Sequence, residues 1–175
     1  MKALRSPLGS LPGLMVLFLS LEGASGELPV ARFPARVMDI DGKVLDVGKL
    51  AGEKRLVVVT LKAAWCPVCR EQLARIKKRL MESRACEVTY LVLSPGPVEE
   101  LKAIRRGLEF PFPFIEDKGL AIADSLGLRL SKDEIQPSVF ILKPDLSVGW
   151  MQNGRGTEYF GDPELFKALR CADWI

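Results

Sequence analysis

Two cysteines separated by two residues, in the motif Cys66-Pro67-Val68-Cys69, are the residues of this chain best suited to chemistry. A thiolate is the attacking species in thiol–disulfide exchange, so a working cysteine needs a pKa below its usual value of about 8.5. Unpaired N–H groups and the positive end of the dipole at a helix N-terminus supply that stabilisation. We therefore expect Cys66 to be solvent-accessible and to attack, and Cys69 to be covered and to close the disulfide.

The absence of histidine narrows the alternatives for this motif. None of the 175 residues is a histidine, which excludes Ser-His-Asp and Cys-His catalysis and His-ligated zinc or haem. A zinc site usually pairs two such motifs, whereas Cys86 and Cys171 are isolated in the sequence. We expect no metal and no cofactor. A merely structural disulfide between Cys66 and Cys69 stays open as an alternative.

A buried strand and an amphipathic helix are predicted on the two sides of the motif. Residues 56–61 form a continuous, mostly β-branched apolar run, which is typical of a strand buried on both faces. Pro67 suits the first position of a helix, where a missing N–H costs nothing. The apolar residues of that helix recur at spacings of four, three and four, on one face: Cys69, Leu73, Ile76 and Leu80.

The rest of the chain alternates strands and helices. An N-terminal hairpin is predicted within 34–47, around the turn Asp41-Gly42. Strands are then expected at 88–93, 112–115, 138–142 and 147–151, and helices from 98 to about 107, over 117–126 and from 162 to about 170. This alternation predicts the α/β class, with a central mixed sheet flanked by helices after the N-terminal β-hairpin.

The N-terminus carries the pattern of a secretory signal peptide. Lys2 and Arg5 precede an apolar run at 11–21, and small residues follow at 23–26. We expect cleavage after Gly26, which leaves one domain over 27–175 in a secreted or extracytoplasmic protein. The alternative is an uncleaved membrane anchor through residues 8–21, although a spanning helix needs about 20 apolar residues.

The charge balance argues against nucleic acid as a partner. The chain has 25 Lys and Arg residues against 22 Asp and Glu residues, a formal net charge of +3. The chain has no cluster of Lys and Arg interleaved with aromatic residues, as a nucleic-acid interface would require.

The stretch Trp65–Arg70, the strand before it and the segment 136–140 resemble the thioredoxin-fold redoxins. More narrowly, the chain is similar to the alkyl hydroperoxide reductase/thiol-specific antioxidant (AhpC/TSA) family and to exported thioredoxin-like disulfide reductases, from about Phe33 to Leu169. The resemblance implies a thioredoxin-like fold. It also implies that the proline matching Pro137 is cis, faces the redox pair and helps to hold a substrate backbone. The alternative is an ordinary trans proline at the start of an edge strand.

The residues that this resemblance assigns to the site fall into two sets. Cys66 and Cys69 match the catalytic pair. The residues expected to contact substrate are Trp65, Pro67, Gln136 and Pro137.

Two positions depart from the patterns of related families. Thioredoxins carry a buried aspartate six residues before the first cysteine, where this chain has Thr60. Peroxiredoxins require a proline and a peroxide-binding threonine, where this chain has Val59 and Ala63. The first departure removes the usual carboxylate for proton transfer, and the second predicts poor peroxide reduction.

The same resemblance places Cys86 and Cys171 at the pole of the sheet opposite the redox pair. A structural disulfide between them is one hypothesis, because an exported protein can keep it. The alternative is that Cys86 is a small buried apolar residue and Cys171 a free terminal thiol.

The sequence therefore predicts a thiol–disulfide oxidoreductase. Its expected partners are disulfide-containing proteins or small-molecule thiol substrates, together with an upstream thiol reductant or oxidant. Two alternatives remain: a thiol-dependent, peroxiredoxin-like peroxidase, and a redox-inactive binding module with a structural disulfide.

Overall fold

The N-terminal hairpin is present as predicted. The computed structural model describes residues 30–80, 87–154 and 162–169, so the predicted signal peptide lies outside the described residues. Strands β1 (Arg36–Met38) and β2 (Val44–Asp46) pair antiparallel. The carboxylate of Asp39 accepts hydrogen bonds from the N–H groups of Asp41 and Lys43, at 2.9 and 2.8 Å. Gly42, with φ of 80°, supplies the left-handed conformation that this turn needs.

A short helix that the sequence analysis did not predict follows the hairpin directly. Helix α1 covers Val47–Glu53, and the Asp46 carboxylate caps it by accepting from the N–H of Lys49 at 2.8 Å. Its apolar residues Val47 and Ala51 are buried against the sheet. Helix α1 thus covers part of one face of the sheet.

The central sheet has five strands in the order β5-β4-β3-β6-β7. Strands β3, β4 and β5 are parallel, and β6 and β7 add antiparallel pairs on the other side of β3. This is the predicted mixed sheet, and its strands are β3 (Arg55–Thr60), β4 (Val88–Ser94), β5 (Phe114–Glu116), β6 (Ser138–Leu142) and β7 (Val148–Asn153).

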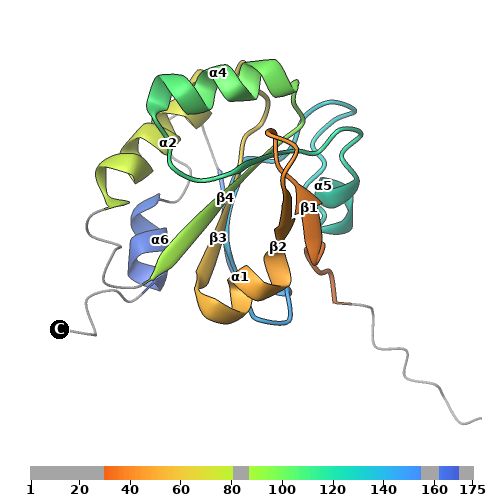
Figure 1. Ribbon diagram of the computed structural model, residues 1–175, viewed down its shortest axis with the longest axis vertical. Helices are drawn as coiled ribbons and strands as arrows, with labels where there is room; N and C mark the ends of the chain where they lie inside the picture. Colours follow the sequence, from red (N-terminus) through yellow and green to blue (C-terminus); the bar gives the residue numbers. More distant parts are fainter. Residues whose placement is uncertain (1–29, 81–86, 155–161, 170–175) are drawn as a thin grey trace, which may run out of the picture.

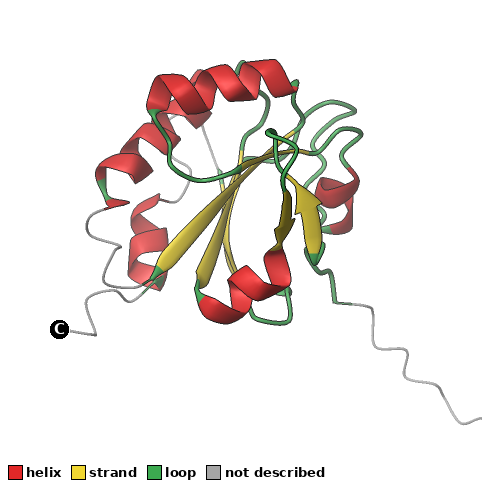
Figure 2. Ribbon diagram, in the orientation of Figure 1, coloured by secondary structure: helices red, strands yellow, loops and turns green. Residues whose placement is uncertain are grey.

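Helices cover both faces of this sheet, as Figures 1 and 2 show. Helices α2 (Pro67–Lys78), α4 (Val98–Leu108) and α6 (Asp162–Ala168) contribute to one apolar core. Helices α1 and α5 (Ala121–Ser125) and the hairpin contribute to the other. The arrangement is the predicted thioredoxin-like fold, with the helix that follows the cysteine motif on the first face.

Alternation along β3 and β4 explains how one sheet serves two cores. Val57 and Val59 of β3 face the core beneath α2, whereas Leu56 and Val58 face the core beneath α1. All four side chains are completely buried. The continuous apolar run in the sequence is therefore a strand covered on both faces, as predicted.

Two elements begin later than predicted, for local reasons. Strand β5 starts at Phe114 instead of 112, after Pro113, which has no N–H to contribute to the sheet. Helix α5 starts at Ala121 instead of 117. Asp117 still caps it, but across an intervening turn, by accepting from the N–H groups of Ile122 and Ala123 at 3.1 and 2.8 Å.

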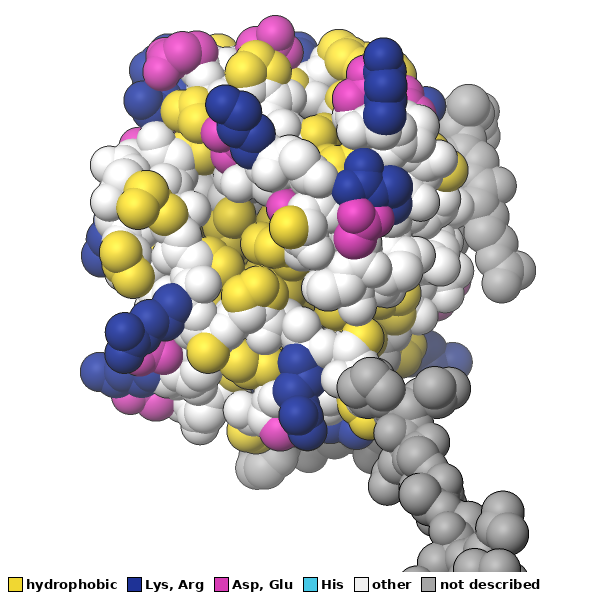
Figure 3. Space-filling view, turned by 90° about the vertical axis from the view of Figure 1, so that its right-hand side faces the viewer, with side chains coloured by type: hydrophobic (Ala, Val, Ile, Leu, Met, Phe, Trp, Pro, Cys, Tyr) yellow, Lys and Arg dark blue, Asp and Glu magenta, His cyan; other side chains and the backbone are white. Residues whose placement is uncertain are grey.

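One face of the molecule is more apolar than its charged surroundings. Figure 3 shows apolar side chains gathered at the centre of the side that carries the hairpin and α5, with charged side chains around them. Met38 and Val44, which are register partners in the hairpin, are 61% and 59% exposed. None of the described helices is both long and apolar enough to cross a membrane.

Candidate active site

Helix α2 begins directly at the cysteine motif. Pro67 is its first residue and Cys66 its N-cap, with an extended backbone. Cys66 and Cys69 form the predicted disulfide, and their Cα atoms lie 5.4 Å apart. The N–H of Cys69 donates to the Cys66 sulfur with an N–S distance of 3.3 Å. The N-terminus of the helix therefore directs an N–H group that has no partner within the helix at the sulfur of the first cysteine, as expected.

The two cysteines differ in exposure less than predicted. Cys69 is completely buried, and Cys66 is only 5% exposed. The prediction that Cys66 is solvent-accessible is therefore wrong for the disulfide form, because its side chain packs into the core with Leu61 and Ala64. The exposed residues on either side of Cys66 are instead Trp65, at 59%, and Pro67.

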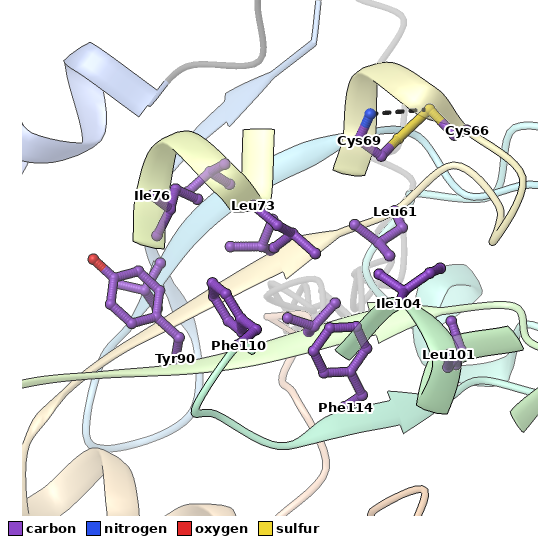
Figure 4. Close-up of a cluster of buried hydrophobic side chains, with 14 of the residues drawn as sticks. Leu61, Cys66, Cys69, Leu73, Ile76, Tyr90, Leu101, Ile104, Phe110 and Phe114 are labelled. Carbon is purple, nitrogen blue, oxygen red and sulfur yellow. Dashed lines mark hydrogen bonds between the residues drawn. A yellow bond between two sulfur atoms is a disulfide. The ribbon is translucent and has the colours of Figure 1, made fainter. Parts of the chain in front are cut away.

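Behind the disulfide, the predicted apolar face of α2 anchors the motif. Leu73 and Ile76 are completely buried, and Figure 4 shows them on the same side of the helix as Cys69. They pack in one cluster with aromatic residues of β4 and the segment before β5, including Tyr90 and Phe110. Burial of each such side chain stabilises the fold by about 1.5–3 kcal/mol. The cysteines are thus fixed to a rigid element.

Thr60, at the position of the buried aspartate of thioredoxins, has a structural role here. Its hydroxyl donates to the carbonyl oxygen of Gln136 at 2.7 Å and accepts from the N–H of Ser138 at 2.6 Å. Thr60 and Ser138 are completely buried. The side chain therefore holds the segment that leads into β6 against the end of β3.

The resemblance implied a cis peptide bond before Pro137, and this prediction is wrong. The Gln136–Pro137 bond is trans, and the cis bond in the described part of the chain is Gly96–Pro97. Pro137 is buried, and its carbonyl oxygen accepts from the N–H of Gly154 at 2.7 Å. Directly after it, Ser138 pairs with Thr60 on one side and with Asn153 on the other. Pro137 therefore lies directly before β6 in the trans form.

Gln136 is held by contacts on three sides. Its N–H donates to the Leu128 carbonyl at 2.7 Å and its carbonyl accepts from Thr60. Its side-chain amide donates to the Gly154 carbonyl at 3.1 Å. The predicted substrate-binding amide is thus directed to the end of β7.

Lys62 connects the proline segment to the redox pair, and the sequence analysis missed it. Its N–H donates to the Cys69 sulfur at 3.4 Å, and its carbonyl oxygen accepts from the N–H of Ile135 at 3.1 Å. Its ammonium group lies 5.2 Å from the centre of the Trp65 ring and 3.3 Å from a carboxylate oxygen of Glu134. One residue thus touches the second cysteine, the exposed indole and the segment before Pro137.

Arg70 is a second residue that sequence reasoning missed. Its guanidinium donates to the Ala64 carbonyl oxygen through Nε and Nη2, at 3.1 and 2.7 Å. These two hydrogen bonds tie the loop between β3 and α2 to the first turn of α2. Arg70 directly follows Cys69, which is the one signal in the sequence that could have singled it out.

The described residues bear on three further points: a metal site, a second disulfide and the binding of peroxide. Among the described residues, no group of three or more histidine, cysteine or acidic side chains is placed to hold a metal ion. Cys86 and Cys171 lie outside the described residues, so the bridge between them stays a hypothesis. Ala63, at the position of the peroxide-binding threonine of peroxiredoxins, is 4% exposed and offers no hydroxyl group.

Solved structures with the same fold include two kinds of redox protein. Peroxidoxin BcpB from Mycobacterium tuberculosis superposes with a TM-score of 0.67 at 18% identity, covering 83% of this chain and 96% of its own. A cysteine-to-serine mutant of Xanthomonas campestris peroxiredoxin Q gives a TM-score of 0.67 at 20% identity, over 84% of this chain and 96% of its own.

A secreted Mycobacterium tuberculosis disulfide oxidoreductase homologous to E. coli DsbE is also similar. Its TM-score is 0.61 at 17% identity, over 77% of this chain and 92% of its own. No curated protein sequence matches the chain.

The model of the AhpC/TSA family matches residues 28–151, most of the chain. The fold, the redox pair and this match agree with the family expected from the sequence. The protein belongs to the AhpC/TSA family.

Proposed function

We propose that this protein is a thiol–disulfide oxidoreductase in which Cys66 attacks and Cys69 resolves. The observation that carries the proposal is the Cys66–Cys69 disulfide at the N-terminus of α2, with Cys66 as the N-cap. A dithiol that closes within one helical turn, without moving the backbone, can cycle between its two redox forms.

The proposed reaction conserves electrons in two exchanges. In the reduced protein, the Cys66 thiolate attacks one sulfur of a substrate disulfide, and the other substrate sulfur leaves as a thiolate that takes up a proton. The Cys69 thiolate then attacks the Cys66 sulfur of the mixed disulfide, and the second substrate thiol is released. The protein ends as the disulfide, the substrate gains two electrons, and an external dithiol returns the protein to its reduced form.

Backbone N–H groups support negative charge on each sulfur in turn. The N–H of Cys69 is directed at the Cys66 sulfur, and the N–H of Lys62 at the Cys69 sulfur. Hydrogen bonds of this kind favour a thiolate over a thiol. Because Thr60 offers a hydroxyl and no carboxylate, another group, water or the leaving thiolate must take the proton of Cys69.

Of the other predicted site residues, we assign one a contact with substrate and the rest a structural role. Trp65 is exposed beside the disulfide, and we assign it a contact with substrate. Pro67 sets the start of α2 and lies at the exposed rim. Gln136 and Pro137 are assigned a supporting role, because their contacts are with Thr60 and Gly154.

A thiol-dependent peroxidase is the second candidate, and the comparisons support it equally. Peroxiredoxin Q and peroxidoxin BcpB share the fold, and AhpC/TSA is the family of the chain. The local chemistry favours exchange instead, since Ala63 has no hydroxyl for a peroxide to bind. A redox-inactive module with a structural disulfide is the third candidate.

The proposal also includes export of the protein. A signal peptide over residues 1–26 would direct the domain to a secreted or extracytoplasmic site, where substrate disulfides persist. The direction of electron flow there depends on the upstream thiol reductant or oxidant.

A turnover assay with two oxidants separates these candidates. The reduced full-length protein is mixed with a fluorogenic glutathione disulfide or with hydrogen peroxide, with dithiothreitol as the recycling reductant. An oxidoreductase consumes the disulfide catalytically and the peroxide no faster than an ordinary thiol. Fast turnover of peroxide alone would establish the peroxidase. Turnover of neither the disulfide nor the peroxide would favour the structural role.

A further inference from the structure

The indole of Trp65 is exposed, yet its position is restrained. At 59% exposure it is the most accessible large apolar group beside the disulfide. The Lys62 ammonium lies 5.2 Å from the centre of its ring, within the range of a cation–π contact. An aromatic ring that is both exposed and restrained is suited to contact a partner.

Glu134 in turn restrains Lys62. Their ion pair has an N–O distance of 3.3 Å, with side chains 31% and 24% exposed. The pair on α1 between Lys49 and Glu53, by contrast, spans 3.8 Å with side chains 69% and 57% exposed. Exposed pairs fix side chains weakly, whereas a shorter and more buried pair loses less to solvent screening.

The backbone reinforces this connection. Ile135 donates its N–H to the carbonyl of Lys62, so the Lys62 backbone and side chain both bond to the segment 134–135. On the other side, the N–H of Lys62 donates to the Cys69 sulfur. The position of the indole is therefore set by the same residue that contacts the redox pair.

We propose that Lys62, held by Glu134, is a positioning residue that fixes the Trp65 indole as the docking platform for polypeptide disulfides with an apolar side chain next to the cysteine. The proposal rests on the proposed function and adds a substrate class to it. An apolar side chain laid on the indole removes both surfaces from water, which a small disulfide without apolar side chains cannot match.

A purely electrostatic role for Lys62 makes a different prediction. A nearby ammonium group favours a thiolate, so loss of Lys62 and loss of the Glu134 charge would then shift the pH profile of cysteine alkylation in opposite directions. In the positioning role both changes loosen the indole and act in the same direction. The two roles can therefore be separated with Lys62→Met and Glu134→Gln.

The experiment compares these variants and Lys62→Arg with the wild-type protein, and uses Lys49→Met on α1 as the matched control. KM and kcat are measured for a peptide disulfide with leucine beside the cysteine and for hydroxyethyl disulfide. Acrylamide quenching of Trp65 is obtained as the difference between each protein and its Trp65→Phe counterpart, and it reports the exposure of the indole without any turnover. The pH profile of cysteine alkylation is recorded for each variant of Lys62 and Glu134.

We expect Lys62→Met and Glu134→Gln to raise KM for the peptide by roughly threefold. The kcat for the peptide and the KM for hydroxyethyl disulfide should change less, because both variants keep the Lys62 N–H that contacts the Cys69 sulfur. Both should increase quenching of Trp65, Lys62→Arg should restore the wild-type values, and Lys49→Met should match the wild type. Unchanged KM and quenching, or opposite shifts of the alkylation profile that account for the rate changes, would overturn the role of Lys62. Absence of exchange in the wild-type protein would instead remove the proposed function, and the platform with it.

Discussion

Thr60 and Ser138 are joined by a hydrogen bond of 2.6 Å from the N–H of Ser138 to the Thr60 hydroxyl, at the end of β3 nearest the redox motif. The same hydroxyl donates to the carbonyl of Gln136, so one side chain satisfies a buried N–H and a partly buried carbonyl. The position that carries a proton-transferring aspartate in thioredoxins thus serves here to hold the entry to β6.

Replacement of Thr60 by valine tests this structural role. Valine has the same shape but leaves the N–H of Ser138 and the carbonyl of Gln136 without this partner, which costs about 1–3 kcal/mol of unfolding free energy. Urea unfolding measures the loss, and Thr60→Ser, which keeps the hydroxyl, is the matched control. A valine variant as stable as the wild type would show that water replaces the hydroxyl without cost.

Peroxide should be a poor oxidant of the reduced protein. Ala63 is buried where peroxiredoxins place a peroxide-binding threonine, and Val59 lies within β3 where they place a proline. Stopped-flow oxidation by hydrogen peroxide should be as slow as that of an ordinary thiol. Rates matching those of dedicated peroxidases would contradict this and favour the second candidate function.

Acid should weaken the contact between the hairpin and α4. The Arg105 guanidinium donates two hydrogen bonds to the Asp41 carboxylate, at 2.7 and 2.8 Å, and lowers the pKa of that carboxyl from its ordinary 3.8. A lowered folded-state pKa contributes stability above the unfolded value that is lost as pH falls through the folded value. Asp41→Asn should therefore be less stable than the wild type at pH 7, and equal to it well below pH 3.8.

Urea unfolding from pH 7 to acid measures this difference for Asp41→Asn. Glu53→Gln, which removes one carboxylate from the exposed pair on α1, is the matched control for the loss of an acidic side chain. A difference that persists unchanged in acid would show that charge on Asp41 is not its source.

The parts of the fold with local signals were predictable from the sequence. The buried run of β3, the apolar face of α2 and the turn at Gly42 carry periodicity or turn chemistry, and each is present. Helix α1 was missed because its seven residues follow a strand directly and depend on burial of Val47 and Ala51 against the sheet.

The candidate site was predictable only where its residues are neighbours in the sequence. Cys66 and Cys69 form the disulfide expected from their spacing. The pair Lys62–Glu134 is created by the fold and has no pattern in the sequence. The cis form of Pro137 was inferred from related families and not from any pattern in this sequence, and the bond is trans here.

Trapping of mixed disulfides tests the central claim most directly. A Cys69→Ser variant cannot resolve the first exchange, so it should accumulate a covalent complex with a disulfide peptide, identified by mass spectrometry at Cys66. Cys66→Ser should trap none, because Cys69 is completely buried behind it. Trapping that survives Cys66→Ser and requires Cys69 would reverse the assignment, and trapping by neither variant would contradict thiol–disulfide exchange as the function of this pair.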